Sequence, residues 1–292
     1  MTMETTDDSD RERAYEAERR DGVLRVRRSD HDADAEWLST GWNGGRRTAD
    51  CAYNVSVPDG WDRTDLEAYV DERLERADFA DSGDGDGTAV AGGEDETRDA
   101  GGEPPVLLTG VDLEDARGAQ CGPVTVYATA GISNPAALPM APDASTDADA
   151  DPGPDSDFDS ELDPTGTVNL IVGTTRALEP GALANLIAVA AEAKAATLLA
   201  ATGFPGTTTD AVVVGHDPSG PATSFSGSGT AVGAATRACV RDAVRASLRA
   251  HYAGIDQQVP SSVDAATHGV STDVRASVFR PTPSDGSPGQ GN

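Results

Sequence analysis

The sequence predicts a single layered domain of the α/β (or α+β) class, in which a mixed β-sheet packs with helices. Short β-branched runs alternate along the chain with long alanine- and leucine-rich segments, which is typical of strands and helices in one domain. Two acidic stretches poor in large apolar residues interrupt this pattern. The remaining chain amounts to roughly 180–190 residues, which is the size of one domain.

Each expected element follows from its local pattern. β-branched runs predict strands at residues 23–28, 49–57, 106–110, 124–129, 168–173 and 211–215. Longer apolar-periodic segments predict helices at residues 66–79, 182–201 and 231–253. Pro180 just before the second helix suits the first helical position.

The rest of the chain is polar. We expect residues 1–22 to be a polar N-terminal segment without the apolar region of a signal peptide, and residues 254–292 to be a disordered tail. The acidic insertions at residues 80–104 and 141–164 bury too little apolar surface to offset the entropy of ordering. We expect these two to be disordered, mobile loops within a domain that spans residues 23–253.

The charge of the chain excludes some functions. Its 50 Asp and Glu against 22 Lys and Arg give a net charge of −28, which repels nucleic acid and anionic membranes. Lys194 is the single lysine, so the cations are otherwise arginine. This composition favours adaptation to molar salt, where a Debye length of about 3 Å screens self-repulsion, over an acidic interaction protein.

The apolar segment 182–201 contains Glu192 and Lys194. Each charge would cost about 2.5–3.5 kcal/mol at the centre of a bilayer. We therefore expect a buried helix, no membrane partner and a cytoplasmic protein.

Standard catalytic and metal-binding patterns are missing from the sequence. No G-x-S-x-G, H-E-x-x-H or C-x-x-C motif occurs, and only His216 among four histidines lies near a polar turn. The three cysteines are widely spaced, and we expect each to be a small buried residue: Cys51, Cys121 and Cys239. No metal site is expected.

Small polar turns follow or precede the apolar runs, at residues 41–45, 129–134, 166–169, 206–210 and 225–230. Any one of them is explained by turn chemistry alone. Five in one domain favour a site built from loops at strand ends. The candidate substrate-binding residues in these turns are Gly44, Gly45, Asn134, Asn169, Thr207, Thr209, Gly227 and Gly229. Because Thr230 can cap the following helix, the last turn suits an anion or an oxyanion.

The helix expected at residues 182–201 carries Lys194 about 200° around its axis from Glu192. Asn185 lies on the same face as Glu192. Two interpretations of Lys194 remain open: an ammonium that snorkels from a helix edge, or one that orients or protonates a substrate. On the helix at 231–253, arginines at an i+4 spacing predict a solvated face: Arg237, Arg241, Arg245 and Arg249.

The ordered set of these segments resembles the adenosylcobinamide amidohydrolase family of corrinoid salvage. The matching segments are WNGG at 42–45, TAGISN at 129–134, GTVN at 166–169, EAK at 192–194, GTTTDAVVV at 206–214 and FSGSGTAVG at 225–233. The resemblance spans residues 36–250, interrupted by the two acidic insertions. It rests on the order of the motifs, since each motif alone has low specificity.

The resemblance implies hydrolysis of the amide that joins the corrin propionyl side chain to 1-amino-2-propanol. The products would be adenosylcobyric acid and aminopropanol, and the acid would re-enter coenzyme B12 synthesis. The cobalt would belong to the small-molecule corrinoid substrate, so we expect no cofactor and no metal of the enzyme's own.

Hypothetical roles follow from the needs of amide hydrolysis. The general base would be Asp210 or Glu192, and Thr208 or a neighbouring threonine would supply a hydroxyl nucleophile if water does not. Asn43 and backbone N–H groups near Gly44–Gly45 or Gly227–Gly229 would stabilise the oxyanion, while Lys194 would orient or protonate the substrate.

Two alternatives stay open. The chain would be a non-catalytic corrinoid-binding protein, or it would hydrolyse another amide, with self-cleavage at a Gly–Thr bond freeing a threonine nucleophile.

Overall fold

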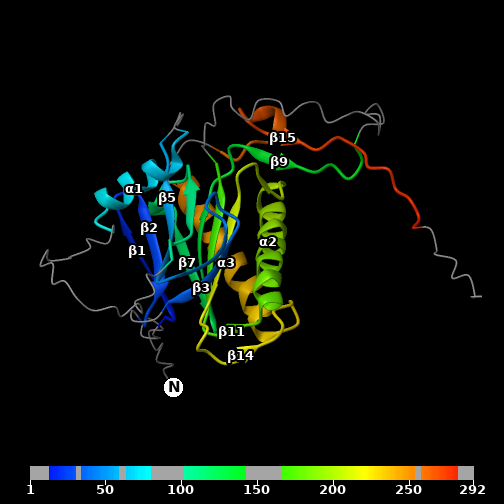
Figure 1. The fold of residues 1–292 in the computed structure, drawn as a ribbon. Coiled ribbons are helices and arrows are strands. Elements are labelled where there is room, and N and C mark those ends of the chain that lie inside the picture. The colour runs from blue at the N-terminus through cyan, green and yellow to red at the C-terminus, as the bar shows by residue number, and fades with distance from the viewer. Residues whose placement is uncertain are drawn as a thin grey trace, which may run out of the picture.

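The computed structural model describes residues 13–30, 34–58, 64–79, 102–142, 166–253 and 258–281. They form four layers, in which two long helices, a six-stranded sheet, a four-stranded sheet and a short helix follow one another (Figure 1). The three helices are α1 (Leu66–Arg76), α2 (Pro180–Thr202) and α3 (Ala231–Ala253). The predicted fold class, a mixed sheet layered with helices in one domain, is confirmed.

The six-stranded sheet carries the turns that the sequence singles out. Its strands, in spatial order, are β4 (Gly45–Ala49), β3 (Ala35–Ser39), β13 (Ala211–His216), β10 (Val168–Thr174), β8 (Val124–Ala130) and β7 (Arg117–Cys121). Only β10 and β13 pair in parallel, because α2 connects them as a crossover; the other pairs are antiparallel.

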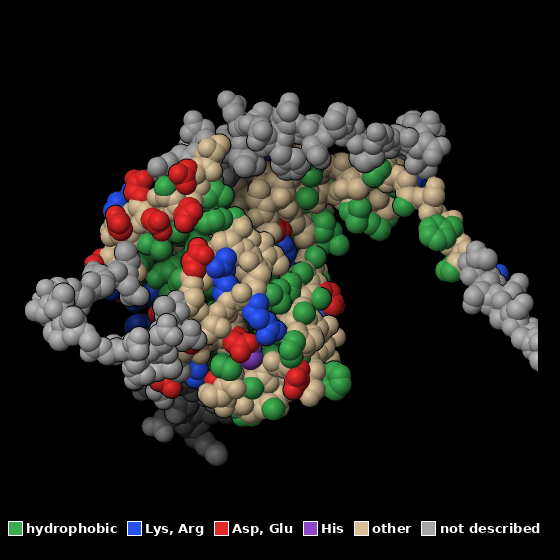
Figure 2. All heavy atoms as spheres, in the orientation of Figure 1, with side chains coloured by type: hydrophobic (Ala, Val, Ile, Leu, Met, Phe, Trp, Pro, Cys, Tyr) green, Lys and Arg blue, Asp and Glu red, His purple; other side chains and the backbone are tan. Residues whose placement is uncertain are grey.

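The four-stranded sheet packs on the face of the larger sheet opposite α2 and α3. Its strands, in order, are β1 (Tyr15–Arg20), β2 (Val23–Arg28), β5 (Cys51–Ser56) and β6 (Val106–Thr109). Helix α1 covers its outer face through Tyr69 and Val70. Figure 2 shows acidic side chains gathered over α1, as the charge of the chain predicts.

Smaller elements complete the described chain. They are β11 (Ala177–Leu178) with β14 (Ala222–Thr223), the sheet of β12 (Gly206–Thr207), β9 (Pro135–Ala137) and β15 (Val270–Ser271), and the short helices η2 (Leu113–Asp115) and η3 (Val263–Ala265).

Two glycines let the sheets approach each other. Gly173 and Gly215 are register partners on β10 and β13. A Cβ at Gly173 would lie 2.5 Å from the Tyr15 ring, and one at Gly215 would lie 2.4 Å from the Trp37 ring. The two rings pack edge to face with centroids 5.9 Å apart, so the buried aromatic pair fills the space that the glycines leave.

The polar segment expected at residues 1–22 contains a strand. Residues 15–20 form β1, because Tyr15 is buried and the strand pairs with β2 despite its charged side chains. Part of the stretch 254–292 is also structured, since β15 pairs with β9. The insertions lie almost wholly outside the described residues.

The helices and the six strand predictions match observed elements with small shifts at their ends, except that residues 49–57 divide between the end of β4 and β5. Polar or short strands such as β3, β4 and β7 were not predicted. One cysteine prediction is wrong: Cys121 is exposed at the end of β7, whereas Cys51 and Cys239 are buried.

Helix α2 is long and apolar enough, by length and composition, to cross a membrane, and it is the one such helix in the described ranges. In the fold it packs against α3 and β13, and its buried residues belong to the main core. The predicted buried helix accounts for its composition.

Candidate active site

Four of the five polar turns meet at one edge of the six-stranded sheet. Strand β8 ends at this edge and its neighbours β10 and β13 begin there, because β8 is antiparallel to the other two. The end of β3 joins them: Val212 donates its backbone N–H to the hydroxyl of Thr40 at 2.9 Å. The C-terminal end of α3 reaches the same edge, where Ser247 accepts a hydrogen bond from Ala130 N at 2.9 Å.

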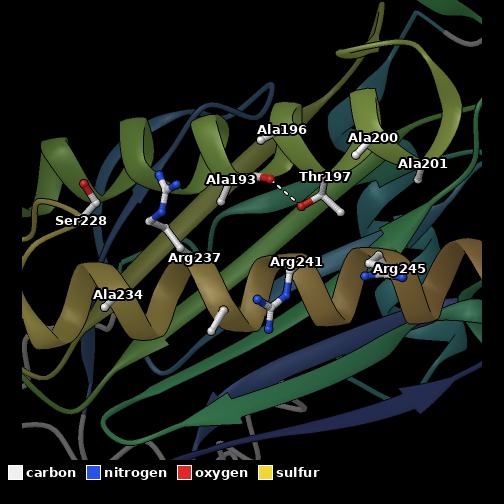
Figure 3. A pocket seen from close by; sticks show the side chains of 11 residues that line it. Ala193, Ala196, Thr197, Ala200, Ala201, Ser228, Ala234, Arg237, Arg241 and Arg245 are labelled. Carbon is white, nitrogen blue, oxygen red and sulfur yellow. Dashed lines mark hydrogen bonds between the residues drawn. The ribbon is translucent and has the colours of Figure 1, made fainter.

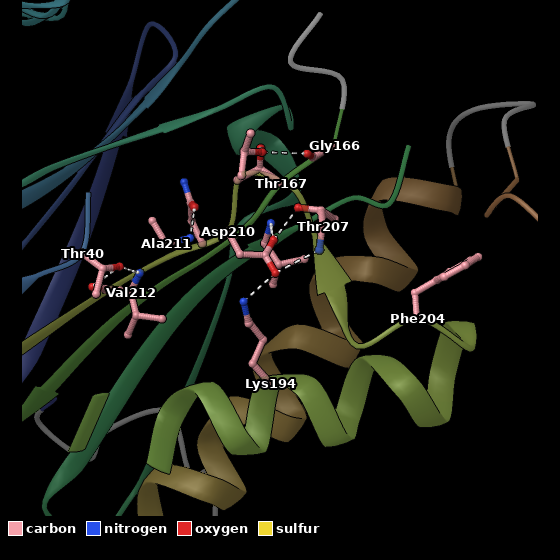
Figure 4. A network of polar contacts seen from close by, with 12 residues as sticks. Thr40, Gly166, Thr167, Lys194, Phe204, Thr207, Asp210, Ala211 and Val212 are labelled. Carbon is pink, nitrogen blue, oxygen red and sulfur yellow. Dashed lines mark hydrogen bonds and ion pairs between the residues drawn. The ribbon is translucent and has the colours of Figure 1, made fainter. Parts of the chain in front are cut away.

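Asp210 is the centre of the polar contacts at this edge (Figure 4). Its Oδ1 accepts from Val168 N at 2.8 Å and from the Thr207 hydroxyl at 2.5 Å. Its Oδ2 accepts from Lys194 Nζ at 2.5 Å and from Thr207 N at 3.1 Å. A carboxylate has about four acceptor positions, so these four bonds fill them. Asp210 therefore fixes the 206–210 turn against β10 and α2.

Lys194 points from α2 into the protein. Its side chain is 10% exposed and that of Asp210 is 9% exposed, so the ion pair is buried. The snorkelling interpretation is therefore wrong. An ammonium has three N–H donors, and within the described residues Asp210 takes one of them. The other two are available to a ligand.

Asn134 and Thr208 lie beside this pair. Asn134 Nδ2 donates to the Thr208 hydroxyl at 2.6 Å, and Thr208 N donates to the Asn134 carbonyl at 3.2 Å. Asn134 is buried, yet within the described residues its Oδ1 has no hydrogen-bond partner. Thr208 is exposed and its hydroxyl oxygen accepts from Asn134, while its proton has no acceptor among the described residues. A buried acceptor without a partner costs about 1–3 kcal/mol, so Asn134 is a candidate for contact with a ligand.

Two further hydroxyls line the same edge. Thr167 and Thr209 lie side by side with their Oγ1 atoms 3.0 Å apart. Thr209 also donates to the carbonyl of Gly166 at 3.3 Å. Thr209 has a single hydroxyl proton, so Thr167 is the donor between the two.

Asn43 holds the 41–45 turn in place. Its Oδ1 accepts from Val106 N at 2.9 Å, and its Nδ2 donates to the carbonyl of Pro104 at 3.0 Å. Gly44 has no room for a side chain, because a Cβ would lie 2.8 Å from the Gly41 carbonyl, and Gly45 has a φ of +99°. The amide of Asn43 is thus occupied with joining this turn to β6.

Asn169 lies in the interior, between the two sheets. Its Nδ2 donates to Asn54 Oδ1 at 3.1 Å and to the Leu108 carbonyl at 2.8 Å, while its Oδ1 accepts from Ala211 N at 3.2 Å. Asn54 continues the network to the Thr129 hydroxyl at 3.0 Å. This placement indicates a structural role for Asn169 rather than contact with a substrate.

Glu192 lies apart from this edge. It is exposed on α2 and pairs with Arg237 of α3, on the side of the helix away from Lys194. As a base it would have no access to the groups around Asp210.

Gly227 and Gly229 lie at the opposite end of α2. Ser226, next to them, donates to the carbonyl of Ala182 and accepts from Asn185 Nδ2 at 3.0 Å, in the first turns of the helix. From Asn185 to Lys194 the helix rises about 13 Å. Thr230 does cap α3, since its hydroxyl accepts from Gly233 N at 3.0 Å. This turn does not contribute to the edge where the other turns meet.

The arginine stripe lines a groove of about 560 Å³ between α2 and α3 (Figure 3). Arg237, Arg241 and Arg245 face alanines of α2 across it. The groove lies on the outer helical surface, and two of its arginines pair with Glu192 and Asp242. The predicted solvated face is therefore also one wall of a groove.

A histidine that no sequence motif indicated also lies at this edge of the sheet. His251, in the last turn of α3, has its Nδ1 3.0 Å from Asp115 Oδ2, and both side chains are largely buried. Its neighbour Tyr252 stabilises the turn after β8. The Tyr252 hydroxyl accepts a hydrogen bond from Ile132 N and donates one to the Ile132 carbonyl, both at 3.0 Å. Burial raises the pKa of Tyr252, so its hydroxyl remains a donor. No local sequence motif predicts this His–Asp pair, because Asp115 and His251 are far apart in the chain.

No cluster of three or more His, Cys, Asp or Glu residues able to hold a metal ion occurs in the part of the chain that the structure describes. The chemistry of the edge is that of hydroxyls, one amide, one ion pair and one imidazole.

Comparisons with known proteins place this arrangement in a family. The family model described as adenosylcobinamide amidohydrolase matches residues 6–91 and 94–255. An adenosylcobinamide amidohydrolase of Halobacterium salinarum is 53% identical over 267 residues, which cover 91% of this chain and all of that protein. One of Methanosarcina mazei is 28% identical over 226 residues, covering 74% of this chain and 90% of that protein.

Among solved structures, the PH0078 protein of Pyrococcus horikoshii aligns with a TM-score of 0.38 and 14% identity over 80% of this chain and 78% of that one. This likeness is too remote to bear on the site. The family model and the Halobacterium relative each cover most of the sequence, and the family that the motifs of the turns suggested is confirmed. The chain belongs to the adenosylcobinamide amidohydrolase family.

Proposed function

We propose that this chain hydrolyses the amide bond of adenosylcobinamide to release adenosylcobyric acid and 1-amino-2-propanol. Its membership of the family over most of its length, with 53% identity to a named amidohydrolase, is the observation that carries the proposal. The reaction would return incomplete corrinoids to cobalamin biosynthesis. The cobalt would arrive with the substrate, and the enzyme would need no cofactor of its own.

Lys194 is the group we assign to the substrate carbonyl. It is buried, charged and held by Asp210, and it keeps two N–H donors for a ligand. A preorganised donor in a site shielded from water stabilises the negative charge that develops on an amide oxygen during attack. Asp210 would act by positioning Lys194 and Thr207, because its acceptor positions are already filled.

Asn134 and Thr208 are the groups we assign to the polar edge of the substrate. The unpartnered Oδ1 of Asn134 suits an amide N–H, and the Thr208 hydroxyl is free to donate to an oxygen. Thr208 is also the hydroxyl best presented for nucleophilic attack if water is not the nucleophile, since it is exposed and oriented by Asn134.

We also propose a cytoplasmic protein in a high-salt cell. The excess of 50 acidic over 22 basic residues and the use of arginine in place of lysine support this. Halobacterium salinarum is the source of the 53% identical relative.

The test is to incubate the purified chain with adenosylcobinamide in molar KCl and to follow the corrinoid by liquid chromatography and mass spectrometry. Formation of adenosylcobyric acid together with equimolar aminopropanol is the expected result. Unchanged substrate that co-elutes with the protein would indicate a corrinoid-binding protein instead. Intact mass checks self-cleavage, since two fragments would replace the 29.9 kDa chain.

A further inference from the structure

Amide hydrolysis needs a proton acceptor, and the two carboxylates first considered for this role are poorly placed. Asp210 has its acceptor positions filled, and Glu192 lies on the outer surface paired with Arg237. The reaction must remove a proton from the attacking water and give one to the leaving amine. The edge of the sheet therefore needs another group that can hold a proton.

His251 is such a group, and Asp115 fixes its orientation. Nδ1 lies 3.0 Å from Asp115 Oδ2, and in the tautomer that donates its Nδ1 proton to this carboxylate the imidazole has a lone pair on Nε2. Within the described residues Nε2 forms no hydrogen bond, so this nitrogen is available. An imidazole backed by a carboxylate is the arrangement that many hydrolases use for proton transfer.

The absence of a side chain at Gly131 allows His251 Nε2 to approach the sheet edge closely. A Cβ built on Gly131 would lie 3.0 Å from His251 Nε2 and 2.9 Å from Val111 Cγ2. The imidazole thus occupies the space that a side chain at position 131 would need. This contact explains the glycine in the turn after β8 and joins the end of α3 to the sheet edge.

The same face of the edge carries the paired hydroxyls. Gly131 N donates to the Thr167 carbonyl at 3.2 Å, which continues the antiparallel register of Ala130 with Val168. Thr167 in turn lies beside Thr209, which precedes β13, with their hydroxyl oxygens 3.0 Å apart. Directly opposed residues point to the same side of a sheet, with Cβ atoms about 4.5–5.5 Å apart. The His251 imidazole, packed against Gly131, therefore lies on the same face of the edge as Thr167 and Thr209, whereas Asp210, the next residue, turns to the opposite face and bonds Lys194 of α2.

We propose that His251, oriented by Asp115, is the general base and general acid of the hydrolysis, an assignment that rests on the proposed function. Nε2 takes a proton from water as the water oxygen bonds to the amide carbon. The tetrahedral intermediate then collapses with cleavage of the C–N bond, and the imidazolium returns the proton to the leaving nitrogen. Water adds across the bond to give a carboxylic acid and an amine, with no other reactant.

The test compares His251→Ala and Asp115→Asn with the wild-type chain in the adenosylcobinamide assay. Loss of a general base is expected to lower kcat by about 100-fold or more with KM changed less than about threefold. Added imidazole is expected to restore part of the activity of His251→Ala, because it can occupy the vacated space. Should His251→Ala fail to fold, His251→Gln carries the kcat test, since an amide can bond Asp115 but cannot accept the proton.

Tyr252→Phe is the matched control. This variant loses both hydrogen bonds between residue 252 and Ile132, so its melting temperature is expected to fall. Its kcat is expected to stay within about tenfold of wild type and not to rise when imidazole is added. Folded His251→Ala that retains kcat within threefold, or that is inactive and does not respond to imidazole, overturns the assignment. A wild-type chain that releases no aminopropanol overturns the proposed function itself, which is a distinct result.

Discussion

Lys194 and Asp210 form a buried ion pair at 2.5 Å, and the two residues differ in how many other partners they have. Asp210 accepts three further hydrogen bonds, from Val168 N and from the backbone and hydroxyl of Thr207. Lys194 has no other partner among the described residues. The pair is therefore asymmetric, and the two halves should respond differently to substitution.

Asp210→Asn is expected to destabilise the protein by about 3–5 kcal/mol, because it leaves the Lys194 ammonium buried without a counter-charge. Lys194→Met should cost less, since the carboxylate keeps three donors. Both variants should lose most activity. Denaturant unfolding in molar KCl measures the two free energies, and an equal cost for both variants would contradict the asymmetry.

Glu192→Gln tests the other carboxylate considered as a base. Glu192 is exposed and pairs only with Arg237 in the described structure, so the change should alter stability by less than about 1 kcal/mol. Turnover should stay within about twofold of wild type. A hundredfold fall in kcat with an unchanged melting temperature would restore Glu192 as a catalytic candidate.

The Asn169→Ala variant tests whether Asn169 stabilises the fold or binds the substrate. The change leaves the Leu108 carbonyl, Asn54 Oδ1 and Ala211 N without their partner, at a cost of about 2–4 kcal/mol. The KM of the folded fraction should stay within about threefold. Thermal unfolding and steady-state kinetics measure the two effects, and a large rise in KM in a stable variant would place Asn169 in the binding site.

The cysteines should differ in reactivity. Burial raises the pKa of Cys239 to about 12, so its thiol stays protonated at pH 8. Burial also raises the pKa of Cys51, whereas Cys121 is exposed. Ellman's reagent should therefore titrate one thiol in the native protein and three in denaturant. Three rapidly reacting native thiols would mean that the core around Cys51 and Cys239 opens readily.

Salt should stabilise the fold. With a net charge of −28, self-repulsion acts over a Debye length of about 10 Å at 0.1 M salt but only about 3 Å at 1 M. The melting temperature should rise markedly between 0.1 M and 3 M KCl. Equal melting temperatures at the two concentrations would show that the acidic composition is not an adaptation to salt.

The long apolar elements could be predicted from the sequence alone. The helices at 182–201 and 231–253 and the strands at 168–173 and 211–215 are buried on one or both faces, so their apolar pattern is strong and local. The family could be predicted as well, because the motifs of the turns occur in order along the chain. The opposite orientation of Lys194 and Glu192 followed from helix geometry alone.

Which polar groups meet depends on the tertiary fold and could not be predicted from local sequence patterns. Strand β1 is charged along most of its length, and its place depends on Tyr15 packing against Trp37 across the chain. The order of the strands brought residues 131, 167 and 209 side by side and left Gly227 and Gly229 at the far end of α2. The partnership of His251 with Asp115 spans 136 residues and arises because the end of α3 reaches the edge of the sheet. Local secondary-structure propensities carry no information about such contacts, because strand order and helix packing determine which distant residues meet.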